Sequence, residues 1–131
     1  MFDVTRYDAK DTSIIVKDMY ITGLGEDMFS AEKDEDNFTE SVGAQGDVVT
    51  SESNNKLGTI TLNVQPTSPQ RKFLLSLANE TEPFPIWAVN KKLGIRCGGT
   101  KARLLKYPAT NLGAEAEDQE FTFRVFDLVM E

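Results

Sequence analysis

The sequence predicts a mainly β protein, namely a β-sandwich or partly closed barrel of antiparallel strands with one flanking α-helix at about 69–80. Short β-branched or alternating segments recur along most of the chain. Only one segment has helical spacing of its apolar residues, so the strands do not alternate with helices as they would in a parallel sheet. With 131 residues the chain has the size of one domain. We therefore expect residues 1–131 to form a single domain.

The first part of the chain predicts a series of short strands. Ser13–Lys17 and Tyr20–Thr22 have the composition of a tight hairpin, and Met28–Lys33 follows as the next strand. Phe38–Val42 and Asp47–Glu52 flank a turn rich in glycine. These last two segments carry few large apolar residues, so we expect part of this region to lie outside the core.

Two later segments alternate most clearly between apolar and polar residues. In Leu57–Val64 and Gln119–Leu128 alternate positions are apolar, as in strands with one face in the core. The second pattern blurs after Val125, which predicts a bulge or the end of the strand. The core residues expected from these strands are Ile60, Leu62, Val64, Phe121, Phe123 and Val125.

The helix is predicted to begin at Ser68–Pro69. Serine is a favourable N-cap and proline suits the first helical position. Pro83 and Pro85 prevent the helix from continuing. A helix of about ten residues is marginal alone, so it must pack on the sheet. Its expected apolar stripe consists of Phe73, Leu74, Leu77 and Ala78.

Three further strands are expected between the helix and the last strand. They are Ile86–Val89, Leu93–Cys97 and Lys101–Lys106. The pair Gly98–Gly99 is interpreted as a turn that closes the second of these strands. Trp87 stands in an apolar strand and is predicted to lie in the core.

The composition argues against an enzyme and predicts no cofactor. The chain has no histidine, which removes Ser-His-Asp and Cys-His catalysis and most zinc sites. Cys97 is the single cysteine, so no internal disulfide is possible, in keeping with synthesis in the reducing cytoplasm of a bacterial host. Arg96 and Lys101 are basic neighbours of Cys97, yet no base or second cysteine accompanies it, so we interpret it as an unreactive strand residue.

Two short motifs suggest ligands but lack the required context. Asp34–Asp36 lacks the spacing of a calcium loop, so solvated charge is the better interpretation. Gly98–Lys101 lacks the preceding glycine and the following helix of a phosphate loop, so a turn is favoured. We therefore predict neither a metal site nor a phosphate site.

Charge is unevenly distributed along the chain. The formal net charge is −7, with −8 in residues 1–60, +6 in residues 61–110 and −5 in residues 111–131. An acidic domain disfavours specific nucleic-acid or membrane-surface binding. No apolar run is long enough to span a bilayer, and Met1–Arg6 lacks the pattern of a secretory signal. The segments of unlike charge are either solvated faces of a monomer or surfaces that meet between copies.

Several blocks together resemble the tail-tube proteins of bacteriophages with contractile tails. The opening block is Tyr7–Val16, and the next begins Ile21–Leu24 and leads into an acidic strand. Val42–Asn55 contains a Gly-Ala-Gln-Gly-Asp turn and a Ser-Asn-Asn turn, and Gly58–Pro69 ends in Gln-Pro-Thr-Ser-Pro before the helix. An acidic and aromatic final strand completes the order. The resemblance covers nearly the whole chain, with its most specific part between Val42 and Ser68.

This resemblance implies a structural, non-enzymatic virion protein. Such proteins form hexameric rings that stack into a hollow tube, which carries DNA during ejection without specific binding. The implied partners are further copies of the chain and the tail sheath, tape measure, baseplate and terminator proteins. The implied inter-subunit arm lies at about 36–56. Its expected interface residues are Phe38, Val42, Gly43, Gln45, Gly46, Val48, Val49, Asn54 and Asn55.

The resemblance also implies an acidic lumen along which DNA phosphates slide. The candidate lumen residues are Asp34, Glu35, Asp36, Glu117 and Asp118. The basic segment 91–106, which includes Lys91, Lys92 and Lys106, would then face acidic neighbouring subunits or the sheath. Two alternatives remain open: a tail terminator or baseplate protein at the end of the tube, and a small β-sandwich binding module.

Overall fold

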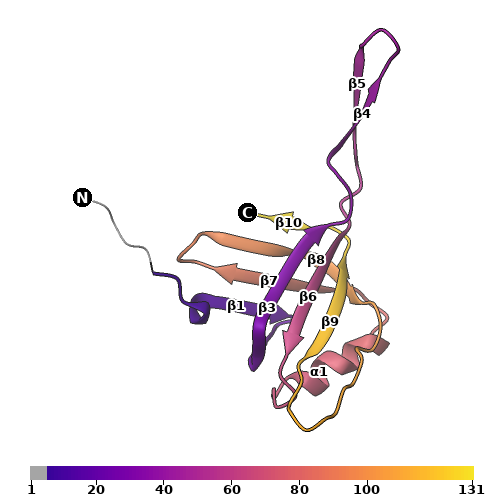
Figure 1. Cartoon of the computed structure of the whole chain (residues 1–131). Helices are drawn as coiled ribbons and strands as arrows, with labels where there is room; N and C mark the ends of the chain where they lie inside the picture. Colours follow the sequence, from indigo (N-terminus) through magenta and orange to yellow (C-terminus); the bar gives the residue numbers. More distant parts are fainter. Residues whose placement is uncertain (1–5) are drawn as a thin grey trace, which may run out of the picture.

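A computed structural model describes residues 6–131. Met1–Thr5 lie outside the described residues, and they belong to the segment in which no secretory signal is expected. The polypeptide forms one eight-stranded sheet and a separate two-stranded hairpin (Figure 1). The large sheet contains β1 (Thr12–Val16), β2 (Met19–Tyr20), β3 (Leu24–Lys33), β6 (Gly58–Val64), β7 (Phe84–Asn90), β8 (Ile95–Leu104), β9 (Gln119–Val125) and β10 (Val129–Met130). The hairpin consists of β4 (Phe38–Val42) and β5 (Val48–Glu52); the helical segments are η1 (Ala9–Asp11), α1 (Arg71–Ser76) and η2 (Leu77–Asn79).

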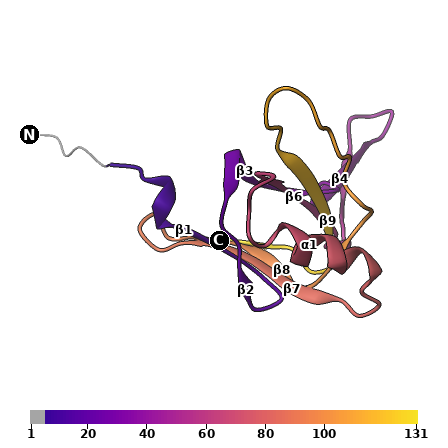
Figure 2. The same ribbon diagram turned by 90° about the horizontal axis from the view of Figure 1, so that it is seen from below.

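The large sheet bends back on itself without closing. Its strand order is β2-β1-β7-β8-β9-β6-β3, with β10 paired to β8, and every pairing is antiparallel. Viewed from below, β1 and β7 lie in one layer and β3, β6 and β9 in another, while α1 lies towards one end (Figure 2). The strands β2 and β3 stand at the two ends of this order, and each has a free edge. The predicted fold class, a partly closed antiparallel β structure with one flanking helix, is confirmed.

The core lies between the two layers. Residues alternate between buried and partly buried along β6, β7 and β9, which is the pattern of strands with one face inside. Phe84 and Phe123 meet edge to face, with ring centroids 6.0 Å apart. All six residues predicted from the alternation are fully buried: Ile60, Leu62, Val64, Phe121, Phe123 and Val125.

The helix packs on this core as expected, but it begins later than predicted. Leu74 and Leu77 are buried, and Phe73 is partly buried against the same cluster. The N-cap is Gln70, whereas Ser68 is buried and its hydroxyl donates a 2.5 Å hydrogen bond to the Thr22 carbonyl. The N-cap prediction for Ser68 is therefore wrong, because its hydroxyl joins the helix approach to the loop before β3.

The expected turn at Gly98–Gly99 is also wrong, because both glycines lie inside the single strand β8. Gly98 has φ +146°, and a Cβ there would lie 2.0 Å from the Ile86 carbonyl oxygen. The register between β7 and β8 shifts between Gly99 and Ala102, as at a bulge. The first part of β8 pairs with β7, and Ala102–Leu104 pair with β9. The glycines therefore allow one strand to pass from one layer to the other.

Trp87 does not lie in the core. Its neighbours Ile86 and Ala88 point inward, so the alternation of β7 places Trp87 on the outer face, where it is half-buried. The guanidinium of Arg96 stacks 3.9 Å from the centre of the indole ring. A long cationic side chain, rather than the core, thus covers this aromatic ring.

A carboxylate fixes the chain reversal after β9. The Asp127 side chain accepts hydrogen bonds from the Thr100 hydroxyl at 2.5 Å and from the backbone N–H groups of Thr100 and Lys101, each at 3.1 Å. Partial burial acts to raise the pKa of Asp127, but these hydrogen bonds together outweigh it, and the pKa lies below its ordinary value. The strand ends at Val125, where the sequence pattern blurs.

Candidate assembly surface

The most prominent surface feature is the β4–β5 hairpin, which projects far from the sheet (Figure 1). We call residues 36–56 the arm. Its strands pair from Phe38 with Glu52 to Val42 with Val48. Every residue of both strands is exposed. An isolated two-stranded hairpin is marginally stable in water, so the arm is the part of the fold that receives the least support from packing.

The two faces of the arm differ in composition. Because side chains alternate along a strand and paired residues share a face, one face carries three of the four large apolar residues together with two carboxylates. We call it the mixed face. Val49 lies on the opposite face, beside Ser41. The mixed face consists of Phe38, Glu40, Val42, Val48, Thr50 and Glu52.

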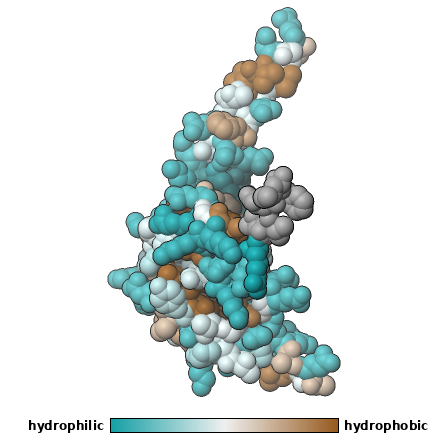
Figure 3. All heavy atoms as spheres, turned by 90° about the vertical axis from the view of Figure 1, so that its left-hand side faces the viewer, coloured by the Kyte–Doolittle hydropathy of each residue, from teal (hydrophilic) through white to brown (hydrophobic). Residues whose placement is uncertain are grey.

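Apolar exposure on the arm is high. Phe38 is 57% exposed, Val42 67%, Val48 58% and Val49 63%. Figure 3 shows brown apolar side chains near the end of the arm, separated from the body by mostly hydrophilic ones. A cluster of this kind on a projecting element is typical of a protein–protein contact site.

The remaining predicted interface residues shape the arm. The turn closes through hydrogen bonds between Gly43 N–H and the Asp47 carbonyl at 2.7 Å and between Gly46 N–H and the Gly43 carbonyl at 3.0 Å, with Gln45 exposed between them. Asn54 is exposed at the base of the arm, whereas the Asn55 side chain accepts a 3.0 Å hydrogen bond from Leu57 N–H. Asn55 thus holds the return of the chain into β6.

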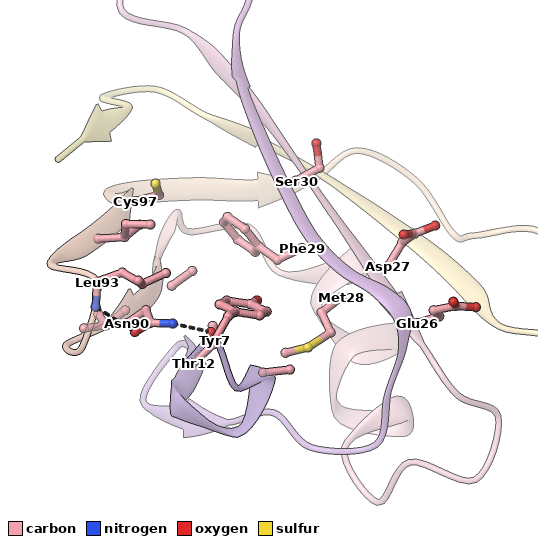
Figure 4. A pocket seen from close by; sticks show the side chains of 14 residues that line it. Tyr7, Thr12, Glu26, Asp27, Met28, Phe29, Ser30, Asn90, Leu93 and Cys97 are labelled. Carbon is pink, nitrogen blue, oxygen red and sulfur yellow. Dashed lines mark hydrogen bonds between the residues drawn. The ribbon is translucent and has the colours of Figure 1, made fainter. Parts of the chain in front are cut away.

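A groove of about 600 Å³ lies between β3 and the end of the β7–β8 hairpin (Figure 4). Met28, Phe29 and Leu93 point into it, and Asn90 donates a 3.1 Å hydrogen bond to the Thr12 hydroxyl at its floor. The carboxylates of Glu26 and Asp27 point away from it (Figure 4). The other lining residues are Tyr7, Ala9, Ser30, Ala88, Val89, Ile95 and Cys97.

The edge of this groove is partly basic. Lys91 and Lys92 form the turn between β7 and β8, directly before the groove residue Leu93, and both are exposed. We call these two residues the lysine rim. Lys92 lies 4.0 Å from the Asp11 carboxylate, a loose and exposed ion pair. Sequence reasoning singled out the basic segment but missed the groove, because the groove is formed by strands far apart in the chain.

The acidic candidates for a lumen lie at opposite ends of one sheet face. Asp34 accepts a 2.7 Å hydrogen bond from the Thr59 hydroxyl and lies 3.8 Å from Arg124 Nε, near the base of the arm. Asp118 precedes β9 and packs against Gly25 at the other end of the sheet. Glu35, Asp36 and Glu117 are exposed beside them. The structure therefore does not gather these carboxylates into one cluster.

Within residues 6–131, no group of three or more histidine, cysteine, aspartate and glutamate side chains is placed to hold a metal ion. None of the helices in that range is long and apolar enough to cross a membrane. The main surface features of the described residues are the arm, the groove and the charged faces.

The sequence matches the family of the bacteriophage PhiTE tail tube protein over residues 16–97. This match covers more than half of the chain. The chain belongs to that tail tube family. The matched range contains the arm and the first part of β8, while the opening block Tyr7–Val16 lies almost wholly before it. Family membership makes the protein a structural component of a phage tail and not an enzyme.

Solved structures of contractile injection systems share the fold. The tube-terminating cap of the anti-feeding prophage has a TM-score of 0.65 at 13% identity, covering 100% of this chain and 94% of that one. The PVC sheath/tube terminator has a TM-score of 0.57 at 14% identity, covering 98% of both chains. A chain of the PVC sheath–tube complex has a TM-score of 0.63 at 15% identity, covering 96% and 91%. No curated protein matches the sequence.

Proposed function

We propose that the protein is the tail-tube subunit itself, which forms hexameric rings that stack into a hollow tube conducting DNA during ejection. The observation that carries this proposal is the arm, because four of its large apolar residues are more than half exposed among the residues that the structure describes. The free edges β2 and β3 supply backbone groups through which neighbouring subunits can extend the sheet. Together these features favour repeated contacts between identical copies.

The proposed tube also assigns a direction to the polar sheet face. The outward-facing side chains of β6 and β9 are mostly threonine, asparagine and charged residues, with Asp34 and Asp118 at the two ends. We assign this face, with Glu35, Asp36 and Glu117, to the lumen. Carboxylates there would repel DNA phosphates, so that DNA passes without being bound.

Proposed partners follow from the same placement. A solved structural neighbour comes from a sheath–tube complex, which supports a sheath protein as an outer partner of this tube. Tape measure, baseplate and terminator proteins complete the proposed set, and the assembled protein would be part of the virion. Host cytoplasmic synthesis belongs to the same proposal.

A terminator at the end of the tube is the second candidate, because two of the solved structures described above are tube-terminating proteins. Assembly behaviour separates the two functions. A tube subunit has a heterologous contact along the axis and extends without limit, whereas a terminator stops at one ring.

The test is negative-stain electron microscopy of the purified protein over a series of concentrations. We expect rings with a central hole that stack into tubes as concentration rises. Single rings that never stack would support the terminator. A monomer at every concentration, even with preformed tail ends added as nuclei, would contradict both functions.

A further inference from the structure

We propose that the groove of one subunit receives the arm of another copy, with the mixed face of the arm turned inward and its two carboxylates against the lysine rim. This assignment rests on the proposed function, since it names the surface on which the arm docks. It adds a specific receptor site and an orientation to a contact that the tube proposal leaves unplaced.

The apolar surfaces of arm and groove complement each other. Phe38, Val42 and Val48 are more than half exposed on one face of the arm. The groove presents Leu93 and Ile95, which are 43% and 42% exposed. Both surfaces bear apolar area against water in the lone subunit, and a single contact would bury both.

The charges match as well. The mixed face carries Glu40 and Glu52, and neither belongs to an ion pair in the described part of the chain. Lys91 of the lysine rim likewise has no carboxylate within ion-pair distance among the described residues. Docking the mixed face inward brings unlike charges together at the edge of an apolar contact, which fixes orientation more than it adds affinity.

The occupant has to come from another copy. The arm leaves the body where β3 ends and β6 begins, and it extends away from the sheet that forms the groove (Figure 1). Its strands are exposed throughout and thus leave the groove of their own subunit open. Because arm and groove are different surfaces, their pairing is heterologous and every subunit can both give and receive an arm.

The groove contains its own chemical probe, because Cys97 is the single cysteine and lies on the groove wall. The variant Val48→Cys places a second thiol on the mixed face. Mild oxidation of the assembled protein with copper–phenanthroline removes two electrons from the two thiols and forms one disulfide where they come close. We expect disulfide-linked chains on non-reducing gels and, by mass spectrometry, a peptide joining positions 48 and 97.

Two controls decide whether such a link reports the docking. Val49→Cys places the thiol on the opposite face of the same strand, and we expect at least a fivefold lower yield of the link to Cys97. Combining Val48→Cys with Cys97→Ser should abolish the link, which separates it from a disulfide between two arms. Equal yields from positions 48 and 49 would overturn the proposed orientation.

Charge reversal gives a second, independent measurement. We expect K91E/K92E to raise the concentration needed for assembly by at least about tenfold. E40K/E52K should do the same, and combining all four changes should restore assembly. Lys106→Glu is the matched control, since Lys106 does not line the groove but a separate pocket that it shares with Asp118, and it should leave the docking of the arm unchanged.

The outcomes distinguish this proposal from the one on which it rests. Tubes that form normally, without a link to Cys97 and without rescue by the combined charge reversal, would overturn the groove assignment and leave the tube function standing. A wild-type chain that forms no assembly under any condition would overturn the tube function, and the groove assignment with it.

Discussion

Replacement of Asp127 by alanine should weaken the whole fold, although Asp127 lies near the end of the chain. Its carboxylate accepts from the Thr100 hydroxyl and from two backbone N–H groups of β8. These bonds hold the reversal after β9 against the strand that joins the two layers. Loss of the carboxylate leaves three donors of Thr100 and Lys101 without a protein partner.

The magnitude follows from the number and exposure of these bonds. A hydrogen bond to a charged group contributes about 1.5–3 kcal/mol where water is excluded. Asp127 is only half-buried, and Thr100 and Lys101 are exposed, so water replaces part of what is lost. We expect Asp127→Ala to lower the free energy of unfolding by about 2 kcal/mol, and Asp127→Asn, which keeps one acceptor, by about 1 kcal/mol.

The pH dependence has a defined sign. Because the pKa of Asp127 is lower in the folded state than its ordinary value in an unfolded chain, the carboxylate stabilises the fold at pH values above that ordinary value. This stability is lost as the pH falls through the lower, folded-state pKa. The difference in free energy of unfolding between wild type and Asp127→Asn should therefore reach its full value at neutral pH and become smaller below about pH 4.

The assay is urea unfolding followed by the fluorescence of Trp87, the single tryptophan, at a concentration where the chain is monomeric. Asp47→Ala is the control, since Asp47 is an exposed aspartate in the arm turn that is bound there through its backbone carbonyl. A loss of less than about 0.5 kcal/mol for Asp127→Ala would refute the reasoning. Equal losses of stability for Asp127→Ala and for the control Asp47→Ala would refute it as well.

Three further predictions use the same unfolding measurement. Gly98→Ala should cost about 3 kcal/mol or more, because a Cβ there meets the backbone of β7. Gly94→Ala, with φ +70° and open space, should cost only about 1 kcal/mol, and equal costs would contradict the close approach at Gly98. Ser68→Ala should cost about 1 kcal/mol by removing the part-buried hydrogen bond from the Ser68 hydroxyl to the Thr22 carbonyl, and no loss would show that water replaces it. Arg96→Ala should cost about 0.5–1 kcal/mol and shift the emission of Trp87 to longer wavelength, and an unchanged spectrum would argue against the stacking.

The central strands could be predicted because their apolar and polar residues alternate in step with the buried and outward-facing positions. Alternate side chains are apolar from Ile60 to Val64 in β6 and from Phe121 to Val125 in β9. The structure pairs these two strands along their full length. A strand with one face in the core needs no distant information to show its period. The same local logic identified the apolar stripe of the helix.

The errors have a common physical cause, which is that partners distant in sequence decide the outcome. Gly98–Gly99 has the composition of a turn, yet both residues pair with β7 inside β8, where Gly98 lies too close to the β7 backbone for a side chain. Trp87 has the composition of a core residue, yet the phase of its strand and the stacked Arg96 place it outside. Neither the approach of β7 nor the stacking is visible in local composition.

Of the candidate assembly surface, the arm could be predicted from local sequence and the groove could not. The arm could be found because its local sequence combines strand character with few large apolar residues, and the structure gives those residues a hairpin of their own. The groove could not, because Phe29 and Leu93 come from segments about sixty residues apart that only the folded sheet brings together. Even so, the basic character of the groove edge was visible in Lys91 and Lys92.

The separation of arm and core has a consequence for how assembly and stability can vary. The buried cluster includes residues from β1, β6, β7, β8 and β9 but none from β4 or β5. Changes on the mixed face of the arm should therefore alter assembly while leaving the unfolding of the body almost unchanged, whereas changes such as Gly98→Ala should alter both. Under the proposed function, a subunit organised in this way can change its contacts with other copies without losing its fold, because the residues of the arm contribute nothing to the buried cluster.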